Sequence, residues 1–458
     1  MSGADLHYIP ASAPAGHKPD GKEEKHKALL ETGYKPSKEE CQQLAEPISY
    51  FLSQCSCYDM LSTSTQVVVL DVDAPLAVAF IAAQETRVQS CVLWDTKQKI
   101  YVGVLTSTDY MQILLFCVSN PDKADAVSTW SIAHWRKMKG KMSSTQTVVD
   151  HTGTALEVDI FKRGRPDGLV SCTTDSTLCE CLQIMKEKDV RRIVGLAEKE
   201  GEAFSVVSMM DVEQIVEFLG VMFFCVEKNQ LGGQEEEDEE KPQDAPSDSD
   251  ESSSKSQRAG SGGDLLHPGR ETEREARKPP SVFSIGDTLL SPKLCEMLSQ
   301  AGEDGLQSEK KVGPYTSIFD IPFCFIENVG VHRHQVIYVL LDQHLHEALS
   351  LLLYYNVESV AVVDSAEGLH IIDVISRSDL LRMEDQGVYN TLLTVREALA
   401  SKLKDKIFVF YEQDSLRSIF AHFVHQRVKE LFMVDPATGK LQGQINISEF
   451  VFLLAFGG

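Results

Sequence analysis

The sequence predicts an α/β (α+β) fold built from four copies of one unit, each with short strands and two helices. Three observations lead to this prediction: a constant spacing of landmark residues, a repeated order of strand and helix patterns, and polar segments that set the copies apart. In each copy a β-rich segment ends at an acidic turn and a Leu, then come an amphipathic helix, a Val and two further β-rich segments. This self-similarity is typical of a repeat protein.

The landmark residues keep nearly the same register in every copy. The Leu and Val are 12 positions apart each time (88 − 76 in the first copy), in the pairs Leu76 and Val88, Leu178 and Val190, Leu345 and Val357, and Leu416 and Val428. From each Val to the acid that opens the last helix the separation is 21, 21, 22 and 21 (109 − 88, 211 − 190, 379 − 357, 449 − 428), which reaches Asp109, Asp211, Asp379 and Glu449. We therefore expect the four copies to fold alike.

The copies are expected to pair, because a unit with roughly three strands and two helices cannot bury both faces of its own sheet. The first copy should pair with the second, and the third with the fourth, giving two modules. The predicted boundaries are 45–118 for the first copy, 119–150 for a helical linker with Trp130 and Trp135, 151–227 for the second copy, 284–383 for the third copy with its preceding segment, and 384–458 for the fourth.

Two polar segments lie outside this pattern. Residues 228–283 contain almost no apolar side chains and many acids, so we predict an acidic disordered insert. Residues 1–44 are rich in Pro, Gly, Lys and Glu, which predicts a disordered N-terminal tail. The serines between Ser247 and Ser254 stand among acids, as in the sites of acidophilic kinases, although a solvating low-complexity segment is the simpler interpretation.

Composition narrows the class of protein. A chain of 458 residues with 43% hydrophobic residues can form proper cores, and its net charge of −24 argues against a nucleic-acid or membrane partner. The start of the chain lacks the apolar region of a signal peptide, and the most apolar stretch, 215–226, is shorter than the roughly 20 residues that span a bilayer. We expect a cytoplasmic protein that could also enter the nucleus.

No metal site is expected from local spacing. The 11 cysteines are odd in number and scattered, as in reduced intracellular proteins, and Cys55 and Cys57 do not have the spacing of a zinc site. The neighbouring histidines His332, His334, His344 and His346 also lack a recurring Cys or acidic partner. Phosphate-loop, dinucleotide, zinc-protease and serine-hydrolase motifs are absent from the sequence, so we expect neither a cofactor nor an enzyme.

The turn before the last helix of each copy carries candidate ribose-binding residues. A hydroxyl or amide residue precedes an acid by three positions in every copy, and a carboxylate fixed there can accept both hydroxyls of a ribose. The candidates are Thr106 and Asp109, Ser208 and Asp211, Ser376 and Asp379, and Glu449, which follows Asn446. The same pattern is also a helix capping box, which for any single copy is the simpler interpretation.

The positions directly after the landmark Val carry candidate phosphate-binding residues. Here the copies differ: the second has Arg191 and Arg192, the fourth Lys429, the first Gln89 and the third Glu358. Arginine makes forked contacts with phosphate oxygens and lysine acts as a point charge, so we predict that the three basic residues bind phosphate. The alternative is that they are solvated charges at a helix C-terminus.

These segments resemble four cystathionine-β-synthase (CBS) repeats, and in particular the gamma subunit of the AMP-activated protein kinase family. The resemblance covers residues 48–458 except the acidic insert, and the segments that carry it are CYD at 57–59, STSTQVVVLDVDAPLAVAF, CVLWDTKQKIYVGVLTSTDYMQIL, VGPYTSI at 312–318 and GKLQGQINISEFVFLLAF. It implies two Bateman modules in a pseudo-symmetric disc. It also implies AMP, ADP or ATP as regulatory ligands, with a kinase alpha subunit and a scaffold beta subunit bound outside.

The chain departs from the family pattern at several contacts. The family usually has Arg where Gln89 stands, His-Arg where Arg191 and Arg192 stand, and His-Arg at Lys429-Glu430. Asp211 stands where the animal subunit lacks its second-repeat acid, and Glu449 replaces the fourth acid. The occupied clefts could therefore differ. A structural CBS subunit or a stand-alone CBS regulator that has lost nucleotide binding remains an alternative.

Overall fold

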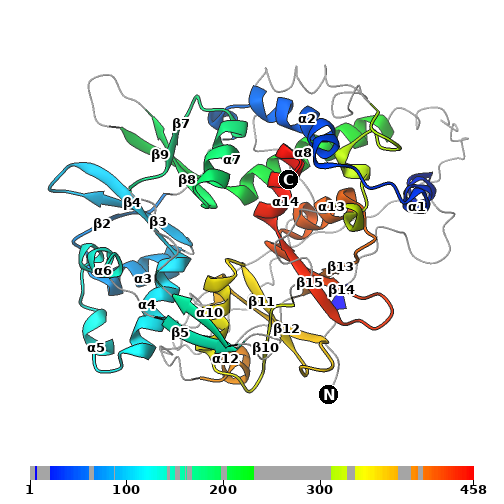
Figure 1. The fold of residues 1–458 in the computed structure, drawn as a ribbon. Coiled ribbons are helices and arrows are strands. Elements are labelled where there is room, and N and C mark those ends of the chain that lie inside the picture. The colour runs from blue at the N-terminus through cyan, green and yellow to red at the C-terminus, as the bar shows by residue number, and fades with distance from the viewer. Residues whose placement is uncertain are drawn as a thin grey trace, which may run out of the picture.

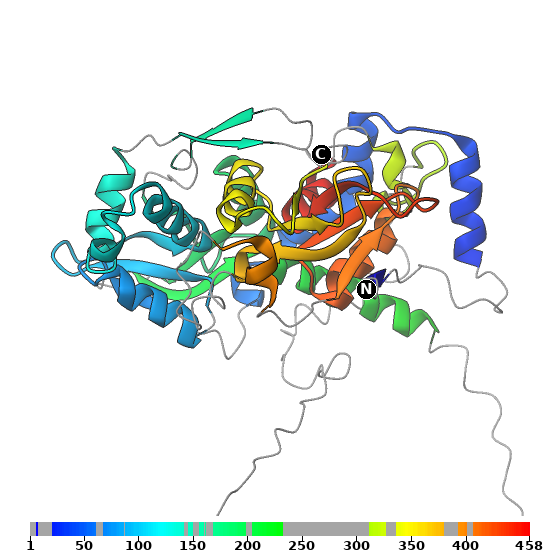
Figure 2. The same cartoon turned by 90° about the horizontal axis from the view of Figure 1, so that it is seen from below.

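The computed structural model describes the backbone of residues 6–7, 21–60, 67–86, 88–141, 145–149, 155–159, 161, 168–197, 204–231, 311–326, 336–379, 393–400 and 406–458. Four small α/β units are arranged around a common centre (Figure 1). The view from below shows that the described body is wide and thin (Figure 2). The predicted α/β fold with four CBS-type repeats is confirmed. Within the described residues, no helix has both the length and the apolar character needed to cross a membrane.

Each repeat contains the predicted order of strands and helices as far as the structure describes it; in the third repeat the last helix begins at 377, and 380–392 lie outside the described part of the chain. The first repeat has β2 (Val69–Asp71), α3 (Leu76–Thr86), β3 (Ser90–Asp95), β4 (Ile100–Thr106) and α4 (Ser107–Ser119). The second has β7 (Ser171–Thr173), α7 (Leu178–Glu187), β8 (Arg192–Ala197), β9 (Ser205–Asp211) and α8 (Val212–Leu231). The third has β10 (Tyr338–Leu340), α10 (Leu345–Tyr354), β11 (Ser359–Val363) and β12 (Ile371–Ser376). The fourth has β13 (Ile407–Phe410), α13 (Leu416–Gln426), β14 (Glu430–Val434), β15 (Leu441–Asn446) and α14 (Ile447–Phe456).

The sheets share one topology. In every repeat the first strand runs parallel to the second, and the second runs antiparallel to the third. The helix between the first two strands is the crossover that a parallel pair requires. A short N-terminal strand, β1 (Leu6–His7), adds to the fourth sheet beside β13. The landmark Leu residues Leu76, Leu178, Leu345 and Leu416 are each the first residue of a helix and are buried.

The paired repeats exchange the segments that precede them. Residues 55–58 bond to the turn before α7, where the Leu178 N–H donates to the Cys55 carbonyl at 2.8 Å. Residues 321–324 bond in the same way to the turn before α13, where the Leu416 N–H donates to the Ile321 carbonyl at 3.0 Å. Residues 130–133 and 393–396 complete the corresponding turns of the first and third repeats. Each repeat is therefore completed by the segment that leads into its partner.

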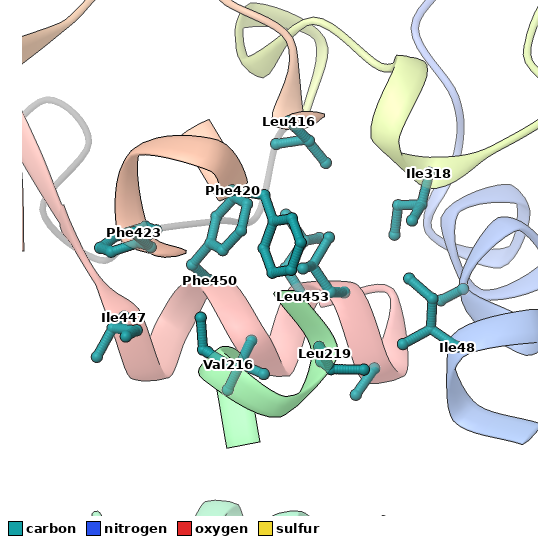
Figure 3. Packing of buried hydrophobic residues seen from close by; sticks show 14 of the residues in the cluster. Ile48, Val216, Leu219, Ile318, Leu416, Phe420, Phe423, Ile447, Phe450 and Leu453 are labelled. Carbon is teal, nitrogen blue, oxygen red and sulfur yellow. The ribbon is translucent and has the colours of Figure 1, made fainter. Parts of the chain in front are cut away.

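The helices join repeats from different modules. One core contains α7 and α8 of the second repeat, α13 and α14 of the fourth, and the N-terminal helix α2 (Lys38–Gln54). Figure 3 shows Phe420 and Phe423 of α13 and Phe450 of α14 above Val216 and Leu219 of α8. A second core joins the first and third repeats, and a third joins the sheets of the third and fourth. The sequence pattern did not predict the helical packing of first against third and second against fourth.

The segments between the repeats hold further structure. They are α1 (Gly21–Thr32), the 3-10 helix η1 (Cys57–Met60), α5 (Ala124–Val127), α6 (Ile132–Lys139), β5 (Thr145–Val149), β6 (Ala155–Asp159), the 3-10 helices η4 (Ile318–Asp320) and η5 (Phe323–Phe325), and α12 (Val395–Ala400). The strands β5 and β6 form an antiparallel pair, so the predicted helical linker ends in a strand.

The prediction of a disordered tail over 1–44 is wrong for its second half. Helix α1 and the first part of α2 lie within 21–44, and the buried side chains of Leu29, Cys41 and Leu44 belong to the large helical core. The prediction rested on the polar composition of the whole segment, and the few apolar residues that make these contacts are spread among polar ones. Helix α8 extends to Leu231, past the predicted start of the acidic insert, whereas 232–283 lies outside the described residues.

Candidate functional site

The positions that follow the landmark Val in all four repeats meet at the centre of the molecule. The Arg192 guanidinium donates hydrogen bonds to the Ser90 hydroxyl at 2.7 Å and to the Gln89 side-chain oxygen at 2.9 Å. The Lys429 ammonium donates to the same Gln89 oxygen at 3.0 Å. These contacts join the first, second and fourth repeats, although 340 positions separate Gln89 from Lys429.

The third repeat joins this centre through Glu358. Its carboxylate forms an ion pair with Arg191, whose guanidinium also donates to the Asn356 carbonyl. The Glu430 carboxylate of the fourth repeat accepts hydrogen bonds from the backbone N–H groups of Glu358 at 2.7 Å and Ser359 at 3.0 Å. All four repeats therefore contribute to one polar centre.

The predicted phosphate-binding cations are all paired with acids. Lys429 lies 2.6 Å from the Glu213 carboxylate, and Arg192 lies 3.7 Å from Asp211 and 3.9 Å from Glu213. We call the whole set the central charge cluster; its members are Arg191, Arg192, Arg377, Lys429, Asp211, Glu213, Glu358 and Glu430. The number of cationic side chains equals the number of acids, so the cluster is close to neutral when all are ionised.

Arg377 was not predicted from the sequence. Its side chain is buried and donates to the backbone carbonyls of Val357 at 2.7 Å and Leu352 at 2.9 Å, and to the Thr108 hydroxyl at 2.8 Å. It also lies 3.9 Å from Glu358. It directly follows Ser376 of the turn pattern, and this charged residue beside a capping serine is the sequence feature that could have indicated it.

Burial perturbs the charged groups of the cluster. Burial raises the pKa of Glu430 to about 8 even though Arg191 opposes the shift, and burial together with Arg377 lowers the pKa of Arg191 to about 9. Burial also lowers the pKa of Lys429, which the Glu213 charge opposes, and raises the pKa of Asp211. The charges are therefore poorly solvated, which strengthens their interaction with any nearby ion.

Three of the candidate ribose acids lie at equivalent strand-to-helix turns. Asp109 accepts hydrogen bonds from the Thr106 N–H at 2.9 Å and from the Lys139 ammonium at 2.7 Å, and Asp379 accepts from the Ser376 N–H and hydroxyl, both at 2.8 Å. At the fourth turn, the Glu449 N–H donates to the Asn446 side chain at 2.8 Å. The capping interpretation therefore holds at these turns, and the ribose role stays a prediction.

The second repeat does not follow this pattern, and the equivalence assigned to Ser208 and Asp211 is wrong. Asp211 pairs with Arg192 across the sheet, as Thr106 pairs with Ser90, so Asp211 occupies the cap position. Its carboxylate accepts from the Gln214 N–H at 2.8 Å, and Gln214 takes the position of the acid. Ser208 lies within β9, opposite Gly195.

A longer hairpin explains the wrong register. The cap follows the landmark Val by 18 positions in the first repeat (106 − 88) and by 21 in the second (211 − 190), so the β8–β9 connection holds three more residues. Counting from the Val therefore reached an acid that lies one turn too early. The second repeat has no carboxylate at the position of Asp109.

Among the described histidines and cysteines, only a group of cysteines has the geometry of a possible metal site. His344 and His346 stack with ring centroids 5.4 Å apart, and His344 occupies the cap of α10, whereas His332 and His334 lie outside the described residues. Within the described part of the chain, the thiols of Cys57, Cys172 and Cys181 lie close enough together to hold a metal ion. Local spacing could not reveal this group, because its members are far apart in the sequence.

Several known proteins with similar sequences belong to one family. A CBS domain model matches residues 326–385. The 5'-AMP-activated protein kinase subunit gamma of Saccharomyces cerevisiae is 36% identical over 421 residues, covering 91% of this chain and 95% of the yeast protein. The Dictyostelium discoideum subunit gamma is 20% identical over 413 residues, and this chain spans about half of it, 51%.

A solved structure from Methanocaldococcus jannaschii, described as a candidate archaeal homologue of the AMPK gamma subunit, matches 87% of this chain and 98% of its own, with a TM-score of 0.46 and 9% identity. The yeast relative is similar over nearly the whole of both chains. The chain therefore belongs to the family of gamma subunits of 5'-AMP-activated protein kinases, as a regulatory CBS-domain subunit.

Proposed function

We propose that this gamma subunit senses adenine nucleotides, whose phosphates bind at the central charge cluster. The observation that carries the proposal is the meeting of Arg191, Arg192 and Lys429 with groups from all four repeats. A ligand bound here would contact both modules at once. Its phosphate charge could therefore change how the modules sit against each other, and such coupling is typically about 1–3 kcal/mol.

The phosphates would compete with the acids of the chain. Asp211, Glu213 and Glu358 already pair with the three cations, so an incoming phosphate must replace a carboxylate as their partner. Each further phosphate adds negative charge near Glu213 and Glu358. The cluster should therefore bind AMP better than ADP, and ADP better than ATP, because like charges repel strongly where water is scarce.

The ribose would lie at the strand-to-helix turns that surround the cluster. Asp109, Asp379 and Glu449 occupy equivalent positions there, with their hydroxyl or amide partners at the helix caps. The second repeat has Gln214 at this position and Asp211 beside Arg192. We propose that the second turn contributes to phosphate binding instead of ribose binding.

The wider role follows from the family. We propose that the chain acts with a kinase alpha subunit and a scaffold beta subunit in the cytoplasm, with access to the nucleus, and that the kinase activity resides in the alpha subunit. The chain itself would perform no catalysis and would carry no cofactor besides the regulatory nucleotides. Copurification of these two subunits with the full chain would support the assembly, and their absence would oppose it.

Calorimetric titration with AMP, ADP and ATP tests the sensing proposal. The full chain should bind AMP in the micromolar range, and an Arg191→Ala, Arg192→Ala double variant should bind it at least about tenfold more weakly, equal to about 1.4 kcal/mol. Arg396→Ala is a matched control, because Arg396 is 58% exposed and its ion-pair partner Asp342 is not a member of the cluster. It should leave the affinity unchanged.

A structural subunit without nucleotide binding is the second candidate. The observation that favours it is the internal pairing of Arg191 with Glu358 and of Lys429 with Glu213, which satisfies these cations without a ligand. A folded chain that assembles with its partners and binds none of the three nucleotides would decide for this role. Equal affinity in the double variant and the wild type would remove the cluster as the binding site.

A further inference from the structure

Three cysteine thiols from separate segments meet inside the apolar core of the second repeat. The sulfur of Cys57 lies 3.1 Å from that of Cys181 and 3.6 Å from that of Cys172, and all three sulfurs lie within 4.8 Å of one another. The three residues are at most 6% exposed. We call this group the thiol cluster.

The backbone fixes the thiol cluster. Cys57 begins η1, and its N–H donates to the Ser176 carbonyl at 2.9 Å in the turn between β7 and α7. Cys172 lies in β7, and Cys181 lies in the first turn of α7, where its N–H donates to the Thr177 carbonyl at 3.0 Å. The three sulfurs are thus brought together by the exchanged segment that completes the second repeat.

The other module shows that the fold does not need thiols here. The Phe323 N–H donates to the Asp414 carbonyl at 2.8 Å, which matches the bond of Cys57 to Ser176. The same correspondence places Phe323, Phe410 and Ile419 where the thiol cluster has Cys57, Cys172 and Cys181. The rings of Phe323 and Phe410 pack with centroids 5.2 Å apart. Ordinary apolar packing fills the equivalent place, so the fold alone does not call for three converging sulfurs.

We infer that Cys57, Cys172 and Cys181 bind one soft, thiophilic metal ion of the Cu(I) class through their three sulfurs. Thiolate ligands select soft ions such as Cu(I) and Zn(II). Structural zinc takes four ligands in a tetrahedral arrangement, whereas the thiol cluster supplies three sulfurs in an apolar surrounding. A three-coordinate monovalent ion fits this set better than zinc does.

The dimensions of the cluster are close to those of a metal site. With metal–sulfur bonds of about 2.3 Å, three sulfurs around one ion lie about 4 Å apart. The Cys57–Cys181 separation of 3.1 Å would therefore widen by a little under 1 Å on binding. Small rotations of the Cys side chains give such a change without moving the backbone.

Metal binding requires the thiolate form of these cysteines, because the thiolate and not the thiol is the metal ligand. The thiol protons therefore leave as the metal binds, so the affinity for the metal should rise with pH.

Anaerobic titration of the reduced, full-length chain with Cu(I), in competition with a chelator, tests this inference. We expect one tightly held ion per chain with three sulfur ligands by X-ray absorption, and a higher Tm in its presence. Cys172→Ala and Cys57→Ala should each lower the affinity at least about a hundredfold. Cys91→Ala is the control, because Cys91 is also buried but lies outside the cluster.

Several results would overturn the inference. One such result is equal Cu(I) affinity in the wild type and in folded Cys172→Ala. Another is a loss of Cu(I) affinity in Cys91→Ala as large as the loss in the cluster variants. Should both cluster variants fail to fold, the wild type alone decides: fewer than three sulfur ligands, or no stoichiometric ion, contradicts it. A Cys57–Cys181 disulfide in the chain purified without reductant and handled anaerobically would also contradict it.

Discussion

The second and fourth repeats meet in two places of opposite character. In the helical core, Phe420, Phe423 and Phe450 pack against α8 through apolar contacts (Figure 3). At the central charge cluster, Arg192 and Lys429 meet around Glu213. Apolar contacts are non-directional and have no substitute partner, whereas an ion pair can exchange one anion for another. The core should therefore determine stability, and the cluster should determine the response to ligands.

The largest effect is expected from Phe450→Ala. The Phe450 ring is fully buried between α13 and α14, so its removal leaves a cavity and should lower the free energy of unfolding by about 3–5 kcal/mol. Urea unfolding at constant pH measures the change. Tyr58→Ala is the control, because Tyr58 is 67% exposed. A change as small as that of Tyr58→Ala would mean that this core does not hold the modules together.

The next effect concerns a buried ion pair outside the core. Lys139 and Asp109 lie 2.7 Å apart, and both side chains are almost wholly buried. Lys139→Ala should lower the free energy of unfolding by about 3 kcal/mol, because it leaves the Asp109 carboxylate without its cation. Lys97→Ala, which breaks the exposed pair with Asp73, should cost less than about 1 kcal/mol. Equal losses in both variants would contradict the burial argument.

The central charge cluster should also make stability depend on pH. The pKa of Glu430 is about 8 in the folded chain and 4.5 ordinarily, so between these values the folded state holds a proton that the unfolded state has released. The free energy of unfolding should therefore fall as pH rises from about 5 to 8, by at most about 1.4 kcal/mol per pH unit. Unfolding measured across this range should show a flatter slope in Glu430→Gln, and an unchanged slope would contradict the assignment.

The smallest effect tests whether the two modules are locally equivalent. Thr177 caps α7 and Ser415 caps α13, each by accepting a hydrogen bond from the N–H three residues later. Thr177→Ala and Ser415→Ala should each lower the free energy of unfolding by about 1 kcal/mol. Thermal unfolding of the two variants compares them directly. A loss in one variant alone would show that the modules differ in stability at this turn.

The repeats could be predicted because their signal is local. The landmark Leu residues begin helices, and the Val and the strands after it recur in all four copies. The turn of the second repeat could not be placed by counting, because a longer hairpin moved Asp211 to the cap and Gln214 to the position of the acid. Residue spacing carries no information about where a loop has gained residues.

Contacts between residues far apart in the sequence could not be predicted from the repeat pattern. Packing of the second repeat against the fourth depends on which helix faces remain apolar after each module has formed. The ion pair of Arg191 with Glu358 and the meeting of Cys57 with Cys181 join residues more than 100 positions apart. The basic side chains of Arg191, Arg192 and Lys429 made them candidates for phosphate binding. Their chemistry alone could not show that acids of the same chain would pair with them.

Titration of Glu358→Gln with AMP tests the central claim most directly. If carboxylates and nucleotide phosphates compete for the same cations, removing the Glu358 charge frees Arg191 and should tighten AMP binding by about tenfold, or about 1.4 kcal/mol. Asp342→Asn is the matched control, because Asp342 pairs with the exposed Arg396. Tighter binding in Glu358→Gln alone would support the account. Unchanged or weaker binding by the folded variant would contradict it.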